Sequence, residues 1–254
     1  MSGKKEAEIY CLAGNLCAPD VFTKIQFPQC FQKKYFDYLN QCSSGNVDQI
    51  ADELIEQVRR DNCEKTVLLG YSAGGVIALA AASKAPELFQ GLILSNTGVC
   101  SSGNSKSHFP QELKQHGREP EFMESFLASC FMNGQLPMEI GEKMLQYALQ
   151  APLDKAIEVS ASLRKVDYSK SIKKYQEPVL ILWGEKDRRR TLTSLLQMEK
   201  CLPQAEVHRL DAGHTRSSDL KFHSYVGCVR QIPEILYGIF EQSFSNMKSY
   251  YGLY

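Results

Sequence analysis

The sequence predicts an α/β protein with a mostly parallel central sheet and helices on both faces. Short apolar runs of strand length alternate along the chain with segments of helical periodicity, as in parallel β/α units. Several of the runs are apolar almost throughout, which is typical of strands buried on both faces. A chain of 254 residues is long enough to bury one large core.

Six apolar runs are the candidate strands of this sheet. Most of them are bounded by Gly, Pro, Asn or Asp, which favour turns. In chain order they are Ile9–Ala13, Tyr35–Leu39, Thr66–Leu69, Gly91–Ser95, Val179–Trp183 and Ala205–Leu210.

Two helices are predicted in the first half of the chain. Apolar residues between Val47 and Val58 recur at three- and four-residue spacing, and Asn46 with Gln49 resembles a capping box at the start of this helix. The segment Gly75–Ala85 is rich in Ala, Val, Ile and Leu and stops before Pro86. It therefore predicts a largely buried helix.

The long interval between the fourth and fifth runs predicts a helical insertion. It has no strand signal, and it would emerge at the carboxyl ends of the strands, where open α/β sheets bind ligands. We therefore expect a core made of residues 1–98 and 173–254 and a helical cap insertion made of residues 99–172. Its clearest helical stretches are Glu121–Phe131, Ile140–Gln150 and Leu153–Leu163.

The motif that points most directly to chemistry is Gly70-Tyr71-Ser72-Ala73-Gly74. It lies between a predicted strand and a predicted helix, the context of a nucleophile elbow, in which a tight turn presents a serine hydroxyl. The flanking glycines allow the strand and helix to approach closely. Ser72 is therefore the candidate nucleophile. The alternative is that its side chain only caps the helix.

A serine nucleophile needs a general base, and His214 is the best placed of the five histidines. It follows the last predicted strand and precedes Val226–Phe244, a segment that predicts a helix kinked or restarted at Pro233. His208 falls within a strand, where packing or surface pairing is the usual role. The remaining histidines fit surface positions: His108, His116 and His223.

The candidate acid that orients this base is Asp187, which follows an apolar strand and a glycine turn. It gives the chain order Ser, Asp, His that is typical of a nucleophile elbow on an α/β sheet. Glu185 and Asp211 are rivals. Glu185 is expected to solvate the turn, and Asp211 would have to bend back to reach His214 three residues later.

The composition gives little support to several classes of partner. Lys plus Arg and Asp plus Glu both number 29, so the net charge gives no reason to expect a nucleic acid or an anionic membrane as partner. The nine cysteines are scattered without metal-ligand spacing, which favours free thiols over zinc or disulfides. No nucleotide, flavin or metal motif is present. We expect a cytoplasmic protein that uses no cofactor and no metal, with its oligomeric state open.

Three sequence elements together resemble the α/β-hydrolase superfamily over nearly the whole chain: Gly70–Gly74, the turn from Trp183 to Asp187, and Ala212-Gly213-His214. The insertion, with Val166-Asp167-Tyr168 leading into Glu177-Pro178-Val179, is similar to the cap of 3-oxoadipate enol-lactonases and pimeloyl-carrier-protein methyl ester esterases. The resemblance implies an α/β-hydrolase fold with a helical cap, here without the first two edge strands.

The resemblance also implies an oxyanion hole made of two backbone N–H groups. One belongs to Ala73, after the nucleophile, and the other to Asn15 or Leu16 in the loop after the first strand. The usual His-Gly of this loop is Ala13-Gly14 here, which keeps the backbone donor and removes a supporting side chain.

The expected activity is hydrolysis of a small carboxylic ester, lactone or thioester, either free or carrier-protein-linked, through an acyl-enzyme. Two alternatives remain: a lyase or carbon–carbon hydrolase that uses the same triad as a base, and a small-molecule receptor with slow turnover. Tyr71, Phe126 and Phe131 are candidates for the substrate pocket. The run Arg188–Arg190 is either a solvated loop or a site for an anionic substrate tail.

Overall fold

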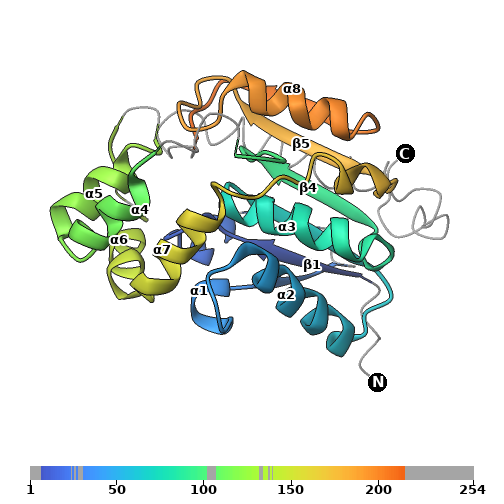
Figure 1. Ribbon diagram of the computed structural model, residues 1–254, viewed down its shortest axis with the longest axis horizontal. Helices are drawn as coiled ribbons and strands as arrows, with labels where there is room; N and C mark the ends of the chain where they lie inside the picture. The colour runs from blue at the N-terminus through green and yellow to red at the C-terminus, as the bar shows by residue number, and fades with distance from the viewer. Residues whose placement is uncertain are drawn as a thin grey trace, which may run out of the picture.

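A parallel sheet of six strands forms the centre of the protein (Figure 1). The computed structural model describes residues 7–214 apart from 24, 26, 28–30, 102–106, 132–133, 137 and 139. Within these residues the strand order is β2-β1-β3-β4-β5-β6, and each neighbouring pair is parallel. The strands are β1 (Ala7–Leu12), β2 (Phe31–Tyr35), β3 (Thr66–Tyr71), β4 (Gly91–Ser95), β5 (Val179–Gly184) and β6 (Glu206–Leu210).

Five of the predicted runs overlap a strand along most of their length, and the second is displaced. We expected a strand over Tyr35–Leu39, but β2 ends at Tyr35 and the short helix α1 (Tyr38–Gln41) follows. The apolar character of the run has another explanation: Tyr38 and Leu39 are buried in the core as residues of α1. The half-buried, polar residues of β2 suit its place at the edge of the sheet.

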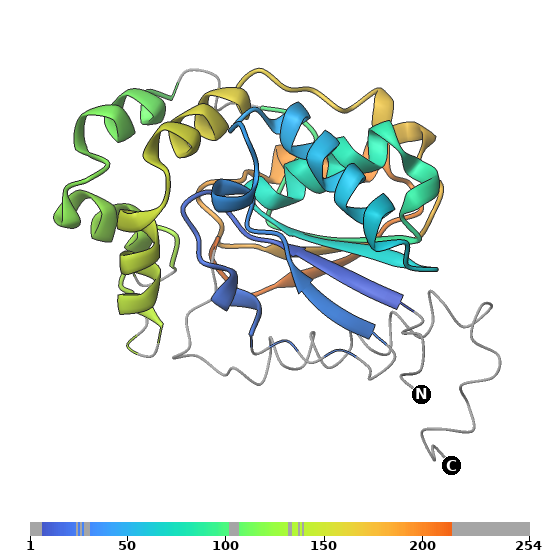
Figure 2. The same ribbon diagram turned by 90° about the horizontal axis from the view of Figure 1, so that it is seen from below.

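The helices α2 (Val47–Asp61) and α3 (Ala73–Lys84) pack against each other and cover one face of the sheet (Figures 1 and 2). The side chain of Asn46 caps α2 by accepting hydrogen bonds from the backbone N–H groups of Asp48 and Gln49. All but the last two residues of α3 are buried, as its composition predicts. A further helix, α8 (Leu192–Cys201), connects β5 to β6.

The four helices of the predicted insertion gather at one end of the molecule, beyond the carboxyl ends of the strands (Figure 1). Side chains and backbone atoms tie this region to the core: the Asn15 amide donates to the Ala156 carbonyl at 2.9 Å, and the Gly45 N–H donates to the Glu158 carboxylate at 2.6 Å. The helices are α4 (Phe109–His116), α5 (Pro120–Ala128), α6 (Gly141–Gln150) and α7 (Leu153–Ser162).

The two ends of the predicted insertion meet. The Tyr168 N–H donates to the Val99 carbonyl at 2.8 Å, and Cys100 forms an isolated antiparallel bridge with Asp167. Short 3-10 helices complete the described structure: η1 (Pro19–Phe22), η2 (Pro86–Leu88) and η3 (Ser171–Lys174). The helix predicted over Val226–Phe244 lies outside the described residues. Among the helices of residues 7–214, none has the length and apolar character that a membrane span requires.

Candidate active site

Ser72 occupies a strained position in the turn from β3 to α3. Its φ of 54° and ψ of −114° are unusual for a residue that carries a side chain. The two motif glycines make this turn possible. A Cβ at Gly70 would lie 2.5 Å from the Gly75 Cα, and a Cβ at Gly74 would lie 2.1 Å from the Leu12 carbonyl oxygen. The turn therefore holds the Ser72 side chain at the carboxyl end of the central strand.

In the triad that the sequence predicts, His214 lies within hydrogen-bonding distance of both Ser72 and Asp187. The Ser72 Oγ is 2.9 Å from the His214 Nε2, and the His214 Nδ1 is 2.7 Å from the Asp187 Oδ2. The side chains of His214 and Asp187 are 5% and 0% exposed. This arrangement of hydroxyl, imidazole and buried carboxylate has the geometry that general-base activation of a serine requires.

Both oxygens of the Asp187 carboxylate have donors. Its Oδ2 accepts from His214, and its Oδ1 accepts from the backbone N–H groups of Arg189 and Arg190 at 2.7 and 2.9 Å. These bonds fix the carboxylate with one oxygen facing the imidazole. The rival Asp211 is exposed and pairs with Lys186 at 2.6 Å instead.

Asn96, which no sequence motif marks, fixes the loop that carries the histidine. It follows β4 with a positive φ of 44° and is 5% exposed. Its side-chain amide donates to the carbonyls of Gly213 and His214 at 3.2 and 2.6 Å, and its Oδ1 accepts from the Gly184 N–H at 2.7 Å. Asn96 therefore joins the ends of two strands to the backbone beside the imidazole.

Two residues next to Asn96, one at the end of β4 and one after it, brace the nucleophile turn in a similar way. The Thr97 hydroxyl donates to the Ser72 carbonyl at 2.7 Å, and the Ser72 N–H donates to the Ser95 carbonyl at 2.9 Å. These bonds help to hold Ser72 in its unfavourable backbone conformation.

Burial lowers the pKa of His214, and the hydrogen bond and charge of Asp187 oppose this effect. The positive charges of Arg189 and Arg190 lower the pKa further. The imidazole is therefore neutral at neutral pH, which is the form that can accept the Ser72 proton.

A cavity of about 120 Å³ opens at Ser72, and it places several predicted residues together. Tyr71 and Phe126 line it, as do the two predicted oxyanion donors Asn15 and Ala73. Leu16, the alternative donor, is fully buried with a φ of 59°. Phe131 is 4% exposed, packs in the core and is not among the residues that line this cavity.

Three arginines also line this cavity: Arg164, Arg189 and Arg190. Two of them belong to the arginine run for which a solvated loop and an anion site were both open, whereas Arg188 is exposed. The third, Arg164, follows helix α7 of the insertion and was not anticipated. The spacing of the sequence gives no signal that would bring it beside the residues after β5.

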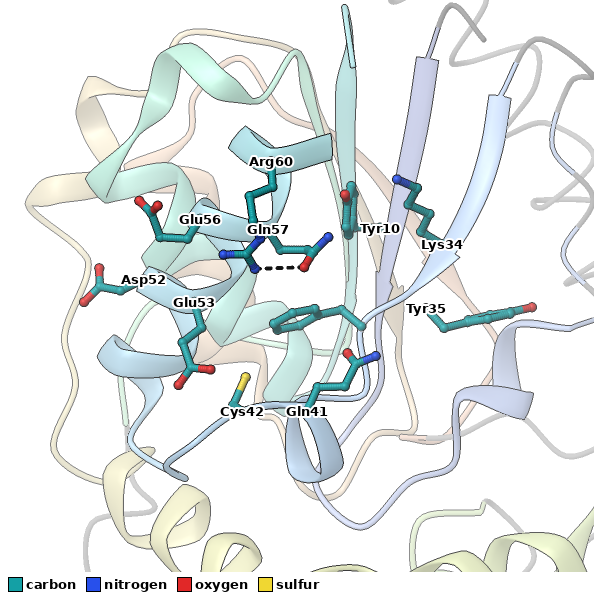
Figure 3. A pocket seen from close by; sticks show the side chains of 11 residues that line it. Tyr10, Lys34, Tyr35, Gln41, Cys42, Asp52, Glu53, Glu56, Gln57 and Arg60 are labelled. Atoms are coloured by element: carbon teal, nitrogen blue, oxygen red, sulfur yellow. Dashed lines mark hydrogen bonds between the residues drawn. The ribbon is translucent and has the colours of Figure 1, made fainter. Parts of the chain in front are cut away.

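A larger cavity, of about 640 Å³, lies between α2 and the strands β1 and β2 (Figure 3). In Figure 3 the Gln57 side chain of α2 points toward Tyr10 on β1, and Glu53 points toward Cys42. Its cysteine, Cys42, is a poor nucleophile because burial raises its pKa to about 12. The size of this cavity therefore does not identify it as a reaction site.

Comparison with known proteins points to one fold. A family model described as "alpha/beta hydrolase fold" matches residues 41–140. A pimeloyl-[acyl-carrier protein] methyl ester esterase from Shewanella sp. (strain MR-7) is 26% identical over 161 residues, which are 59% of this chain and 60% of the relative. A putative carbamate hydrolase, RutD, from Agrobacterium fabrum is 26% identical over 184 residues, or 67% of this chain and 68% of the relative. The chain thus spans about 60% of the length of the methyl ester esterase that it matches.

Solved structures extend the likeness to nearly the whole chain. A putative aryl esterase from Burkholderia cenocepacia superposes with a TM-score of 0.76 at 18% identity, covering 94% of this chain and 92% of its own. The enol-lactonase from Burkholderia xenovorans LB400 superposes with a TM-score of 0.74 at 13% identity, covering 93% of both chains. At these identities the structures establish the shared fold.

Proposed function

We propose that this chain, which has the alpha/beta hydrolase fold and resembles ester-cleaving hydrolases, cleaves a small carboxylic ester, lactone or thioester through an acyl-enzyme. The observation that carries the proposal is the continuous hydrogen-bonded series from Ser72 through His214 to the buried Asp187. No side chain outside this series is needed to activate the hydroxyl.

In the first half of the reaction, the Ser72 Oγ attacks the carbonyl carbon while its proton passes to the His214 Nε2. The Asp187 carboxylate orients the imidazole and stabilises the imidazolium that forms. His214 then gives the proton to the departing alcohol or thiol. In the second half a water molecule attacks the acyl group on Ser72, His214 takes a proton from this water, and the carboxylic acid leaves as Ser72 recovers its proton.

The oxyanion of each tetrahedral intermediate requires two N–H donors beside Ser72. We assign these to the backbone of Ala73, at the start of α3, and of Asn15, after β1. Both residues line the cavity that contains Ser72, whereas Leu16 is fully buried, which favours Asn15 over its neighbour. A Cβ at Gly14 would lie 3.0 Å from the Tyr71 ring, so a side chain at this position would require the ring to shift slightly.

The substrate class rests on the relatives. The similar enzymes from Shewanella are described as acting on a methyl ester of a pimeloyl group carried by an acyl carrier protein. This supports a carrier-protein-linked ester as one candidate substrate. A short ester, lactone or thioester free in solution is the other.

The test is labelling of the purified protein with a fluorophosphonate probe, together with hydrolysis of p-nitrophenyl acetate, butyrate and octanoate. We expect Ser72→Ala to abolish both labelling and turnover. A matched control is Ser83→Ala, which removes a hydroxyl from the same helix, α3, away from the turn. The control should keep both activities.

Two outcomes would contradict the proposal. If the wild-type protein is not labelled, Ser72 is not an activated nucleophile. If it is labelled but turns over none of the esters, the receptor with slow turnover becomes the better description.

A further inference from the structure

The cavity at Ser72 carries a concentration of positive charge that the proposed acyl transfer does not use. Arg164, Arg189 and Arg190 all line it, and its described lining includes no Asp or Glu side chain. Ester cleavage by Ser72, His214 and Asp187 needs no guanidinium group. A charged group in a partly buried site is costly to desolvate unless it serves a partner.

Neutral groups hold Arg164 in place. Its Nε and Nη2 donate to the Ser107 carbonyl and hydroxyl at 3.2 and 2.8 Å, and its Nη1 donates to the Ser160 hydroxyl at 3.0 Å and to the Ser160 carbonyl. These bonds orient the guanidinium plane, and the carboxylate that acts on its charge, Glu112, lines the outer depression rather than the cavity at Ser72. The side chain is thus positioned before any substrate arrives.

Arg189 is oriented by residues at the end of helix α5. Its guanidinium lies over the Phe126 ring at 4.7 Å from the ring centre, and its Nη2 donates to the Phe126 carbonyl at 3.3 Å and to the Ser129 hydroxyl. Stacking on an aromatic ring fixes the plane of the guanidinium group.

These two arginines stand where the cavity at Ser72 joins an outer depression of about 440 Å³. Arg164, Arg189, Phe109 and Phe126 line both hollows. The outer depression is also lined by Glu112 and Arg188. A substrate that reaches Ser72 from the outer depression would therefore pass both guanidinium groups.

We propose that the enzyme selects esters that carry a free carboxylate, and that Arg164 and Arg189 bind this carboxylate while Ser72 attacks the ester carbonyl. A planar carboxylate matches the paired N–H donors of a guanidinium group, and such charge-assisted bonds are short and strong. This inference rests on the proposed function, because it names the substrate class of the same site.

We expect Arg190 to contribute to the positive electrostatic potential of the cavity more than to direct binding of the carboxylate. Burial lowers its pKa, and the nearby Asp187 charge opposes this effect. Its backbone N–H already holds Asp187. We therefore leave Arg190 out of the test, since changing it would disturb the acid as well.

The experiment compares matched pairs of substrates on the purified enzyme. The first pair is the p-nitrophenyl ester of glutarate with its other carboxylate free and with that carboxylate methylated. The second is the butyrate ester of 4-hydroxybenzoate and its methylated counterpart. In at least one pair we expect kcat/KM to favour the charged ester by about tenfold or more. The pair that shows the preference tells which side of the ester carries the anion.

Variants then assign the preference to residues. We expect Arg164→Gln to lower the charged-to-neutral ratio of kcat/KM by about tenfold to a hundredfold, and Arg164→Lys to restore part of it. The control Lys165→Gln removes the same charge from the adjacent, exposed residue and should leave the ratio unchanged. If Arg164→Gln does not fold, Arg189→Gln and the rise of KM for the charged ester with salt provide the same information.

The result that overturns the inference is efficient cleavage of the neutral esters with no preference for either charged partner. An equal loss on charged and neutral esters in Arg164→Gln also overturns it, because the arginine would then only brace the cap. Failure of the proposed function is different, since Ser72 would then give no acyl-enzyme with any ester.

Discussion

The two cavities of this protein differ in a way that size does not predict. The cavity between α2 and β2 has about 640 Å³, and the cavity at Ser72 has about 120 Å³. In the larger one the charges find partners within the protein: Asp52 pairs with Lys84 at 2.8 Å, and Lys34 pairs with Glu8 at 2.7 Å. Because these charges are paired and the Cys42 thiol is protonated, the residues that line this cavity offer no activated nucleophile.

At the smaller cavity three polar side chains form one hydrogen-bonded series that ends at the Ser72 hydroxyl. Ser72 is held in a strained turn, His214 is kept neutral by burial, and the carboxylate of Asp187 is oriented by two backbone donors. The difference teaches that convergence of oriented groups, and not volume, distinguishes a candidate reaction site.

The largest expected effect in the smaller cavity follows from Asp187→Asn. The amide cannot stabilise the imidazolium and favours the wrong tautomer of His214, so we expect kcat to fall by about three to four orders of magnitude. Hydrolysis of p-nitrophenyl butyrate measures this. Asp211→Asn, an exposed carboxylate after β6, is the matched control. Equal activity of the two variants would remove Asp187 from the site.

A smaller effect is expected from Asn96→Ala. The change removes three hydrogen bonds and places alanine at a positive φ, so we expect a loss of about 1–3 kcal/mol in the free energy of unfolding. The loop of His214 would shift, lowering kcat by about tenfold to a hundredfold. Urea denaturation and steady-state kinetics measure both.

Asn62→Ala is the control for this variant. Asn62 also has a positive φ, 47°, but it ends α2 outside the lining of the Ser72 cavity. It should lose stability without losing activity. If Asn96→Ala kept full kcat, its hydrogen bonds would matter for the fold alone.

The pH profile tests the electrostatics of the smaller cavity. Because burial lowers the pKa of His214, kcat/KM should rise with pH and reach half its plateau below the ordinary histidine value of about 6.5. The same shift makes the unfolded state bind protons more readily, so this group's contribution to stability is present above about pH 6.5 and is lost as the pH falls below that value. An acid limb centred above pH 6.5 would contradict the assignment.

The smallest effect is expected in the larger cavity. Because the raised pKa keeps the Cys42 thiol protonated at neutral pH, Cys42→Ala should leave kcat/KM for p-nitrophenyl butyrate within about twofold. Loss of activity in this variant would show that the larger cavity takes part in the reaction and would break the contrast between the two.

Local patterns explain why much of the fold and the candidate site could be predicted from sequence. A serine between two glycines, flanked by an apolar strand and an apolar helix, marks the turn at Ser72. Asp187 and His214 each follow a strand, and parallel strands end at the same edge of a sheet. Their meeting in space therefore follows from topology.

The remaining features depend on contacts between distant segments. Asn96 and Gly184 are 88 residues apart, and no periodicity links Arg164 in the insertion to Arg189 after β5. The displaced second strand has another cause. An apolar run of five residues fits a buried helical turn as well as a strand, and Tyr38 and Leu39 form the turn.

The contact between the two ends of the predicted insertion affects which parts of the protein can change in evolution. Because the Tyr168 N–H bonds to the Val99 carbonyl and Cys100 bridges Asp167, the chain leaves and re-enters the sheet layer at nearly the same place. We expect that these paired ends allow the predicted insertion to be replaced by a shorter or unrelated segment without moving β4 or β5. Substrate specificity could then change in evolution while the fold and the candidate site of Ser72, Asp187 and His214 stay the same.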